Sequence, residues 1–392
     1  MCLLASLSAV TFTFVAVAER ELPDRFSFSR EDGFSFCTPF LMARPHETAK
    51  AVSTGETTAD YDVSLFGVIP VKTVAGQAAA RQNVTVSGQC FGIRLYSDGA
   101  MVVGLTELET QDGACSPSFE AGLRQGDIIT AVDGSRITEN GQIVSLLAAA
   151  GGNAVSVDFT RNGKTYHTTL SPVQVNGTWK AGMWVRDSVA GIGTLTYFDG
   201  RNNVFAGLGH GITDAESGGV YPLFSGSAVL ATVTGVKKGE VGLPGELKGY
   251  FTDTAVGDLF ANTEQGVFGS KNASFSPAGE TLPVAFRQET AKGKATLYCD
   301  VGDGVKGYAV EVERIRLNER APTRNMVVRV TDERLLARTG GIVQGMSGSP
   351  LVQNGRLIGA VTHVFVNDPT RGYAIFAENM LDAAESLLQD AA

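Results

Sequence analysis

Short apolar segments between glycine-rich turns run along most of this chain, and this pattern limits its fold more than any other feature. The 392 residues include 47 glycines and 13 prolines. Glycine and proline divide a chain into short pieces, which favours short strands and turns over long helices. We therefore expect a mainly β protein. The strand-like segments are residues 66–74, 190–199, 203–210, 228–236, 294–302, 307–317 and 325–332.

The second half of the chain, residues 176–392, carries most of these segments and ends in an amphipathic helix. The turn at Asn354-Gly355 is typical of a β-hairpin, and the helix places Met380 and Leu381 on one side. Many short strands followed by a terminal helix fit a double β-barrel or a sandwich. We expect residues 176–392 to form one such domain.

Charge and cysteine content exclude several classes of function. The formal net charge is -9 and no basic cluster is present, so nucleic acid is not an expected partner. The five cysteines form no CxxC pair, so we expect no zinc site, and nothing in the sequence calls for another metal or for a cofactor. The scattered cysteines fit buried thiols, or one disulfide if the protein is exported.

An uncharged apolar segment occupies residues 2–18. Ala16-Val17-Ala18 has the small-x-small form of a signal-peptidase site, and the length of the segment also suits a membrane anchor. We expect residues 1–18 to be a signal or anchor segment, with a buried N-terminal helix as the alternative. Residues 19–85 are mixed in composition, and there we expect a linker with local structure.

One serine lies in a turn that suits a nucleophile. The stretch GGIVQGMSGSPLVQNGRLIGAVTH, residues 340–363, places Ser347 in a glycine-rich turn and then continues as an apolar strand. Gly345 and Gly348 allow backbone angles that a Cβ forbids, so the turn can hold one hydroxyl at its tip. A serine hydroxyl needs a base, and donors for the oxyanion that forms. We expect the N–H groups of Gly345 and Ser347 to be those donors.

The choice of base is narrow, because the chain has four histidines, which are His46, His167, His210 and His363. His210 ends an apolar strand in FAGLGHGITD and lies in the same β-rich half as Ser347. A base at a strand end beside a cleft suits a hydrolase, so we expect His210 to take the Ser347 proton. The alternative is a structural turn serine and a histidine whose hydrogen bonds are satisfied locally.

Residues 86–175 are expected to form a separate compact module. The run AGLRQGDIITAVDG, residues 121–134, resembles the PDZ-domain consensus almost position for position. The resemblance implies that CFGIRL, residues 90–95, forms the carboxylate-binding loop and first peptide-pairing strand, whose exposed edge would bind a peptide or C-terminal tail. The alternative is a β-rich module without a ligand. The expected ligand contacts are Cys90, Phe91, Gly92 and Ile93.

A second resemblance extends from about residue 65 to residue 390. The segments SVAGIGTLTYFD, LGHGITD, VKKGEVGLPGELKG and TGGIVQGMSGSPLVQNGRLIGAVTHVFVNDPTRGYAIF are together similar to the stage IV sporulation protein B (SpoIVB) peptidases. That family couples a PDZ domain to a chymotrypsin-like serine peptidase domain behind an N-terminal membrane segment. The resemblance implies a regulatory serine endopeptidase that cleaves itself and a membrane-tethered regulatory protein in sporulation signalling. It also implies a location between the forespore and mother-cell membranes.

The acid that would orient His210 has several candidates. The family resemblance implies Asp332, in VTDERLLARTGG. From the residues alone, Asp253 and Asp258 lie nearer in chain order to the place between two barrels where such an acid usually sits. Asp214 follows His210 by four positions and can bond to it locally. A water molecule or a backbone carbonyl is the remaining alternative.

Thr362 and His363 follow the Ser347 hairpin, on the strand that lines the pocket for the residue before the cut in chymotrypsin-like folds. They suit a polar or acidic substrate side chain, and the alternative is a strand histidine that points elsewhere. A catalytically inactive scaffold that binds peptides through the PDZ-like module is the competing function. A quality-control protease of the HtrA type is disfavoured, because its PDZ domain follows the protease domain.

Overall fold

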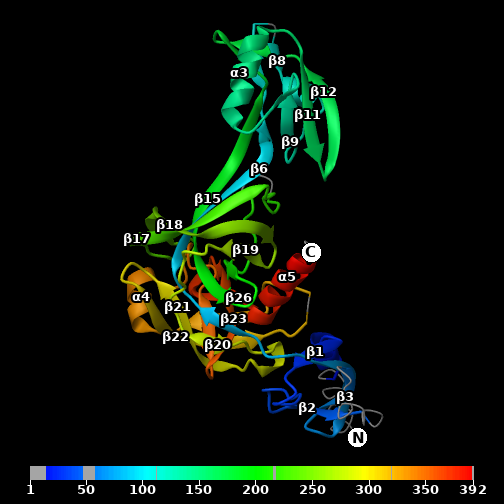
Figure 1. Cartoon of the computed structure of the whole chain (residues 1–392), viewed down its shortest axis with the longest axis vertical. Coiled ribbons are helices and arrows are strands. Elements are labelled where there is room, and N and C mark those ends of the chain that lie inside the picture. The colour runs from blue at the N-terminus through cyan, green and yellow to red at the C-terminus, as the bar shows by residue number, and fades with distance from the viewer. Residues whose placement is uncertain (1–14, 47–57, 112, 215–217, 319, 391–392) are drawn as a thin grey trace, which may run out of the picture.

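The computed structural model of the chain is mainly β, as expected, and the described part begins in a helical segment, residues 15–21. In chain order it contains an N-terminal sheet, a first barrel with a long insert, and a second barrel that ends in a helix (Figure 1). The described residues are 15–46, 58–111, 113–214, 218–318 and 320–390.

The first barrel is a closed ring of strands in the order β6-β17-β18-β19-β16-β15, in which β15 returns to pair with β6. Phe91, Leu95 and Phe205 are fully buried in its core. Two short strands, β5 (Asn83–Val86) and β20 (Thr281–Pro283), continue the sheet from β15. The barrel strands are β6 (Cys90–Leu105), β15 (Met183–Asp199), β16 (Val204–Gly207), β17 (Ser225–Lys237), β18 (Glu246–Thr263) and β19 (Gly266–Lys271).

The second barrel closes in the order β21-β22-β23-β26-β25-β24, so a double β-barrel is present as expected. Residues 176–392 do not form it alone, because β6 of the first barrel lies before them in the chain. The terminal helix α5 (Ala377–Asp390) buries Met380, Leu381 and Ala384, the side expected from the sequence. The remaining elements are η2 (Arg287–Glu289), β21 (Gly293–Asp300), β22 (Val305–Ile315), β23 (Met326–Val330), α4 (Glu333–Thr339), β24 (Pro350–Gln353), β25 (Arg356–Phe365) and β26 (Asp368–Phe376).

The insert is carried at the far end of β6 and β15, which leave the first barrel side by side (Figure 1). Its core includes Leu123, Ile129, Ile143 and Leu147. Its elements are β7 (Leu108–Thr110), β8 (Gly113–Cys115), α2 (Pro117–Glu120), β9 (Ile128–Val132), β10 (Ser135–Arg136), α3 (Asn140–Ala150), β11 (Val155–Arg161), β12 (Lys164–Leu170), β13 (Val173–Val175) and β14 (Thr178–Lys180).

The position of this insert corrects the boundary expected at residue 86. Ser97-Asp98-Gly99 has the composition of a hairpin turn, but β6 runs through it as one strand from the barrel into the insert. Gly99 has φ +125°, and a Cβ there would lie 2.2 Å from the Ile129 carbonyl oxygen, so glycine is required where the strand bends. The module is therefore inserted within the first barrel and does not precede it.

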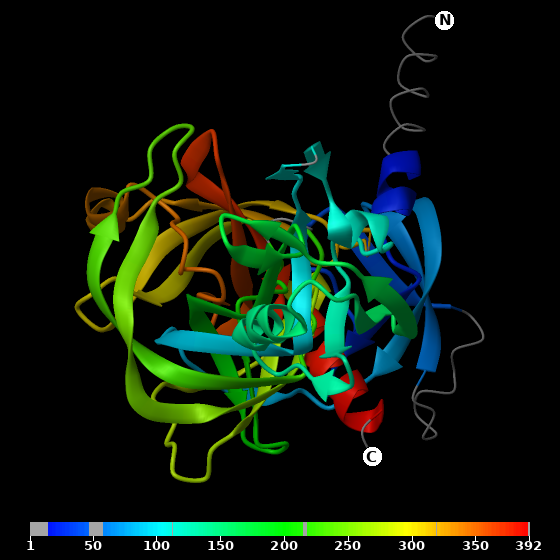
Figure 2. The ribbon, with the colours of Figure 1, turned by 90° about the horizontal axis from the view of Figure 1, so that it is seen from above.

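The described parts of residues 19–85 form a sheet, where the sequence predicted a linker with local structure. The strands pair in the order β1-β4-β3-β2, with an aromatic core that includes Phe26, Phe34 and Tyr61. This sheet lies at the opposite end of the molecule from the insert (Figure 1) and, seen from above, on the other side from the β17–β18 hairpin (Figure 2). Its strands are β1 (Arg25–Phe28), β2 (Leu41–Pro45), β3 (Thr58–Leu65) and β4 (Ile69–Ala78).

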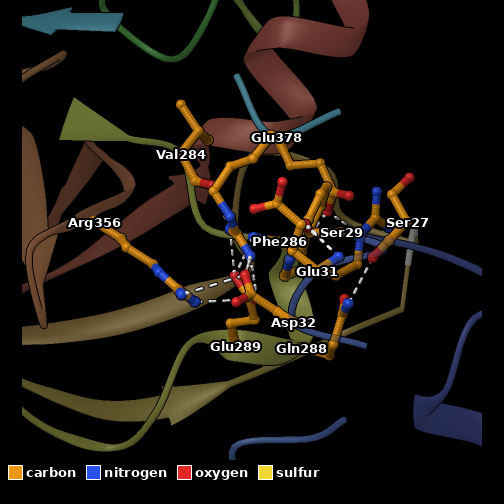
Figure 3. A network of polar contacts seen from close by, with 12 residues as sticks. Ser27, Ser29, Glu31, Asp32, Val284, Phe286, Gln288, Glu289, Arg356 and Glu378 are labelled. Carbon is orange, nitrogen blue, oxygen red and sulfur yellow. Dashed lines mark hydrogen bonds and ion pairs between the residues drawn. The ribbon is translucent and has the colours of Figure 1, made fainter. Parts of the chain in front are cut away.

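A polar network fixes the N-terminal sheet to the second barrel (Figure 3). The Arg81 guanidinium donates to both carboxylate oxygens of Glu289, at 2.8 and 2.6 Å, and to Asp32 at 2.7 Å. Arg356 approaches the same two acids, at 3.1 Å from Glu289 and 3.5 Å from Asp32. Gln288 donates to the Ser27 carbonyl at 2.6 Å. Side chains far apart in the sequence thus join the two units.

The apolar segment expected at residues 1–18 lies, through residue 14, outside the described residues. Among the helices that are described, none combines the length and apolarity needed to cross a membrane. Four cysteines are described as free thiols, and Cys90 and Cys299 are buried, which fits the thiol alternative for these two residues.

Candidate active site

A cavity of about 410 Å³ lies between the two barrels and is lined by Ser347 and His210 together. The first barrel contributes β15 residues 189–192 and the loop after β16, and the second contributes the turn before β24 and part of β25. Thr362 and His363 also line it, as expected. Residues 137 positions apart in the chain thus share one cavity, although the Ser347 hydroxyl and the His210 ring are hydrogen-bonded to other described groups and not to each other.

The Ser347 turn has a conformation that only glycine can support at its corner. Gly348 has φ +93°, and a Cβ there would lie 2.0 Å from the Thr194 carbonyl oxygen and 2.4 Å from the Leu208 nitrogen. The Thr194 N–H donates to the Ser347 carbonyl at 2.9 Å, and the Thr194 hydroxyl donates to the Gly345 carbonyl at 2.8 Å. The first barrel therefore holds the turn that the second barrel presents.

The two expected oxyanion donors are available. Within the described part of the chain, neither the Gly345 N–H nor the Ser347 N–H donates to another protein group, and both residues line the cavity. Gly345 has φ +95°, a left-handed conformation that side chains rarely adopt. Unpaired N–H groups facing a cavity are suited to bind an oxyanion.

The Ser347 hydroxyl is not bonded to a base in this structure. Its Oγ donates to the Thr362 carbonyl at 2.7 Å. A carbonyl oxygen accepts a hydrogen bond but cannot take the proton, so the hydroxyl must leave this partner before His210 can activate it. The structure therefore contains the groups of a nucleophilic site in an arrangement that is not yet reactive.

His210 is held in one tautomer by its own loop. The Nδ1 atom lies 2.8 Å from the Gly211 carbonyl oxygen, which can only accept, so Nδ1 carries the proton and Nε2 is the basic nitrogen. Burial lowers the pKa of His210, and the bond to Gly211 partly offsets this effect. The ring is therefore neutral near pH 7, as a general base must be.

His363 lies against the ring of His210, with the two ring centroids 4.7 Å apart. Burial, followed by the charges of His210 and Arg324, lowers the pKa of His363 to about 4. Its Nδ1 atom is buried and has no hydrogen-bond partner among the described residues. The Thr362 hydroxyl is already bonded to the Thr323 carbonyl at 2.9 Å. These two side chains form a neutral wall, which gives no support to the expected preference for an acidic substrate side chain.

The structure does not bring Asp332 to His210. Asp332 begins helix α4, accepts a hydrogen bond from the Arg334 N–H at 3.0 Å, and also pairs with the Arg334 guanidinium at 2.8 Å. A further bond comes from the Ala309 N–H at 3.1 Å. Arg334 holds the pKa of this carboxyl well below its usual range. Asp332 therefore does not orient His210 in this structure, which is the role that the family resemblance implied. It instead positions the helix that leads into the Ser347 turn.

None of the other candidate acids contacts His210 within the described residues. Asp253 and Asp258 are exposed on β18. Asp214 is 1% exposed and pairs with Arg186 at 2.9 Å. The Nδ1 partner is instead the backbone carbonyl of Gly211, which was the last of the alternatives.

One polar residue in this region was missed by sequence reasoning. The Asn262 side chain accepts from the Ile212 N–H at 2.8 Å and donates to the carbonyls of Ile212 and Tyr221 at 2.9 and 2.8 Å. It therefore fixes both sides of the loop that follows His210. An asparagine close to a turn has the composition of ordinary turn residues, so the sequence contains no signal for this role.

Comparison with known proteins decides the family. The family described as SpoIVB peptidase S55 matches residues 177–381, which is more than half of the chain. The chain belongs to the SpoIVB peptidase family. That family is described as one of peptidases, and the Ser347 turn lies inside the matched region. A PDZ domain matches residues 112–171, within the insert of this SpoIVB peptidase.

Individual relatives of this SpoIVB peptidase match over short stretches. The zinc metalloprotease RasP of Shouchella clausii is 36% identical over 86 residues, or 21% of this chain and 20% of that protein. The putative zinc metalloprotease LL2128 of Lactococcus lactis is 26% identical over 68 residues, or 17% and 16%. The chain thus spans about a fifth or less of either relative.

Solved structures similar to this SpoIVB peptidase include proteases. The active form of the Rv3671c protease from M. tuberculosis has a TM-score of 0.31 at 13% identity, covering 51% of this chain and 74% of that one. The HtrA-type protease AlgW with a decapeptide has a TM-score of 0.30 at 15% identity, covering 55% of each chain. Similarity at this level carries no argument about function.

The prediction that residues 90–95 form the peptide-binding strand of this SpoIVB peptidase is wrong. Phe91 and Ile93 point into the core of the first barrel, and Cys90 is 2% exposed. The strand pairs with β15 on one edge and β17 on the other, so no edge is open to a peptide. At Gly92, a Cβ would lie 2.3 Å from the Phe251 ring. The four expected ligand contacts therefore belong to the barrel.

Proposed function

We propose that this SpoIVB peptidase is a regulatory serine endopeptidase that cleaves its own N-terminal region and a membrane-tethered regulatory protein in sporulation signalling. The observation that carries the catalytic part is the shared cavity, in which His210 has Nε2 as its basic nitrogen and Ser347 lies in a turn with unpaired N–H groups. The signalling role follows from the family resemblance.

The proposed reaction is acyl transfer to water. His210 takes the Ser347 proton at Nε2, and the Ser347 oxygen attacks the peptide carbonyl. The N–H groups of Gly345 and Ser347 stabilise the oxyanion. His210 then gives the proton to the leaving amine, and a water molecule, activated by the same ring, releases the acyl group. The Gly211 carbonyl keeps the ring in the required tautomer.

The residue before the cut is proposed to be apolar. Most side chains around the cavity are aliphatic, including Ile192, Leu208 and Val343, and the neutral His363 offers no positive charge to an acidic group. Cleavage of a peptide library by wild type and His363→Ala tests this step. A preference for Glu or Asp that disappears in His363→Ala would contradict the apolar assignment.

The peptide-binding edge of the PDZ domain is proposed to be the first part of β15. Residues 183–186 pair with β6 on one edge, and no strand of the described chain covers the other edge. Trp184 is 67% exposed there, and Val144 on α3, which packs beside β15, is 59% exposed. An extended peptide or C-terminal tail could add to this edge as a further strand.

Labelling with a fluorophosphonate tests the catalytic proposal. The purified full chain should be labelled, and Ser347→Ala should not. Ser349→Ala is the matched control, because Ser349 lies in the same turn but is fully buried, and its label should remain. Label that persists in Ser347→Ala would contradict the assignment of the nucleophile.

Self-cleavage requires a separate experiment. Wild type is incubated with a tagged Ser347→Ala chain, which cannot cleave itself, and fragments of the tagged chain are sequenced from their N-termini. Cuts within the N-terminal region are expected. An intact tagged chain beside a fully labelled wild type would remove self-processing while leaving the peptidase activity in place.

A further inference from the structure

The two strands that carry the PDZ insert bend at the edge of the first barrel, and we call this bend the stalk. It comprises residues 96–101 of β6 and 186–188 of β15. The pairing is Tyr96 with Ser188 and Met101 with Arg186, with a register shift between them. The irregular pairing therefore involves both strands at this point.

An ion pair joins the stalk to the loop that carries His210. The Arg186 guanidinium lies 2.9 Å from the Asp214 carboxylate, four residues after His210. Asp214 is 1% exposed, whereas Arg186 is 35% exposed. A buried carboxylate depends on the groups that pair with it, of which Arg186 is one, because an uncompensated charge is costly away from water. The loop after His210 is thus held to the insert side of the stalk.

A second contact joins the other end of the same loop to the stalk. Tyr221 is fully buried, and its hydroxyl lies 3.1 Å from the Ser97 hydroxyl. The Ser97 Oγ lies 2.8 Å from the Gly99 carbonyl, so it donates there and accepts from Tyr221. The Tyr221 N–H donates to the Ile212 carbonyl at 2.8 Å. Asp214 and Tyr221 therefore each contact a residue of the stalk.

The insert reaches the same point from its own side. The Asn140 N–H, at the start of α3, donates to the Asp187 carboxylate at 2.8 Å. Asp187 is the neighbour of Arg186 in β15. Helix α3 is thus bonded to the residue next to the ion pair.

We propose that Arg186 and Ser97 are positioning residues for His210, through which the orientation of the PDZ insert sets the reactivity of Ser347. This inference rests on the proposed role of His210 as base. Ser347 is bonded to the Thr362 carbonyl and not to His210, so one of the two must move before catalysis. Asp214 and Tyr221, which follow His210 in the chain, each contact the stalk through a polar side chain, while Asn262 fixes Ile212 and Tyr221 to the first barrel. Coupling between sites of this kind typically changes a binding or reaction constant by about 5- to 150-fold.

The test compares two ion pairs of equal burial. Arg186→Gln breaks the pair with Asp214, and Arg161→Gln breaks the pair with Asp127 inside the insert, where the arginine is 34% and the aspartate 1% exposed. The rate constant of fluorophosphonate labelling is measured on the full chain, well below each melting temperature. Arg186→Gln should lower it about 5- to 150-fold, while Arg161→Gln should change it less than about twofold. Arg186→Lys, which keeps the charge, should recover part of the rate.

Tyr221→Phe provides a second, milder variant that keeps the buried ring, and it should also lower the rate. It decides the question if Arg186→Gln does not fold. The inference would be overturned if both Tyr221→Phe and Arg186→Gln were labelled at the wild-type rate. It would also be overturned if Arg161→Gln lowered the labelling rate as much as Arg186→Gln does. Failure of the proposed function looks different, because then wild type itself is unlabelled or Ser347→Ala is labelled equally.

Discussion

Thr194 connects the first barrel to the nucleophile turn of the second, and its hydroxyl can be removed almost without changing its size. The side chain is fully buried and donates to the Gly345 carbonyl at 2.8 Å. Thr194→Val leaves this carbonyl without its donor. A buried polar group that loses its partner costs about 1–3 kcal/mol, so we expect the free energy of unfolding to fall by about that amount.

The expected effect on the reactivity of Ser347 follows from the same free-energy cost. If the lost hydrogen bond displaces the Gly345–Ser347 turn within the folded protein, a cost of about 1–3 kcal/mol corresponds to about a 5- to 150-fold slower reaction. The assay is the rate of fluorophosphonate labelling of Ser347, with stability measured in parallel by urea unfolding. The backbone bond from the Thr194 N–H to the Ser347 carbonyl remains, so the turn is loosened but not lost.

Thr168→Val is a control for this prediction at a partly buried threonine. The Thr168 hydroxyl donates to the Ala121 carbonyl at 2.6 Å, inside the PDZ insert and away from the cavity. This variant should lose stability without slowing the labelling. The reasoning is refuted if Thr194→Val is destabilised to the same degree as Thr168→Val and yet labels at the wild-type rate.

Three further predictions concern other parts of the molecule. Burial lowers the pKa of His210, and a base acts only when it is unprotonated. The labelling rate of wild type, measured over a pH series, should therefore rise through a midpoint below the ordinary pKa of 6.5 and stay level near pH 7. A midpoint above 6.5 would contradict this prediction. Asp332→Asn retains a helix-capping side chain, so we expect less than about a tenfold loss of labelling rate, whereas loss of an orienting acid reduces kcat about 10⁴-fold. Arg81→Ala removes the main partner of Glu289, whose side chain is 15% exposed. It should lower the free energy of unfolding by about 1–3 kcal/mol and speed the release of the N-terminal sheet by trypsin. An unchanged digestion pattern would show that the network does not hold the sheet.

The features that sequence could predict are those fixed by local chemistry. Asn354 and Gly355 both have positive φ, at 51° and 71°, so their turn can be recognised from two residues. The Ser347 turn depends in the same way on Gly345 and Gly348, whose conformations no other residue tolerates well. Such positions constrain the backbone whatever the rest of the chain does.

The predictions from sequence that proved wrong concern features that depend on partners distant in the chain. β6 has the same apolar pattern whether it forms one strand shared by a barrel and an insert or two strands of one module, so the residues around Ser97 do not reveal the boundary. The acid beside His210 is a second case. Asp332 has Arg334 two positions away, and this local partner occupies the carboxylate. Spacing along the chain does not tell whether Asp332 contacts Arg334 or His210.

The PDZ module leaves the barrel at Tyr96 and rejoins it at Ser188, and these residues are direct neighbours in the ladder between β6 and β15. The gap at the point of departure is therefore no wider than one pair of adjacent strands. A tight turn of two or three residues can replace the entire module and still close the ring below it. A peptidase shortened in this way would be a natural scaffold for exchanging one recognition module for another.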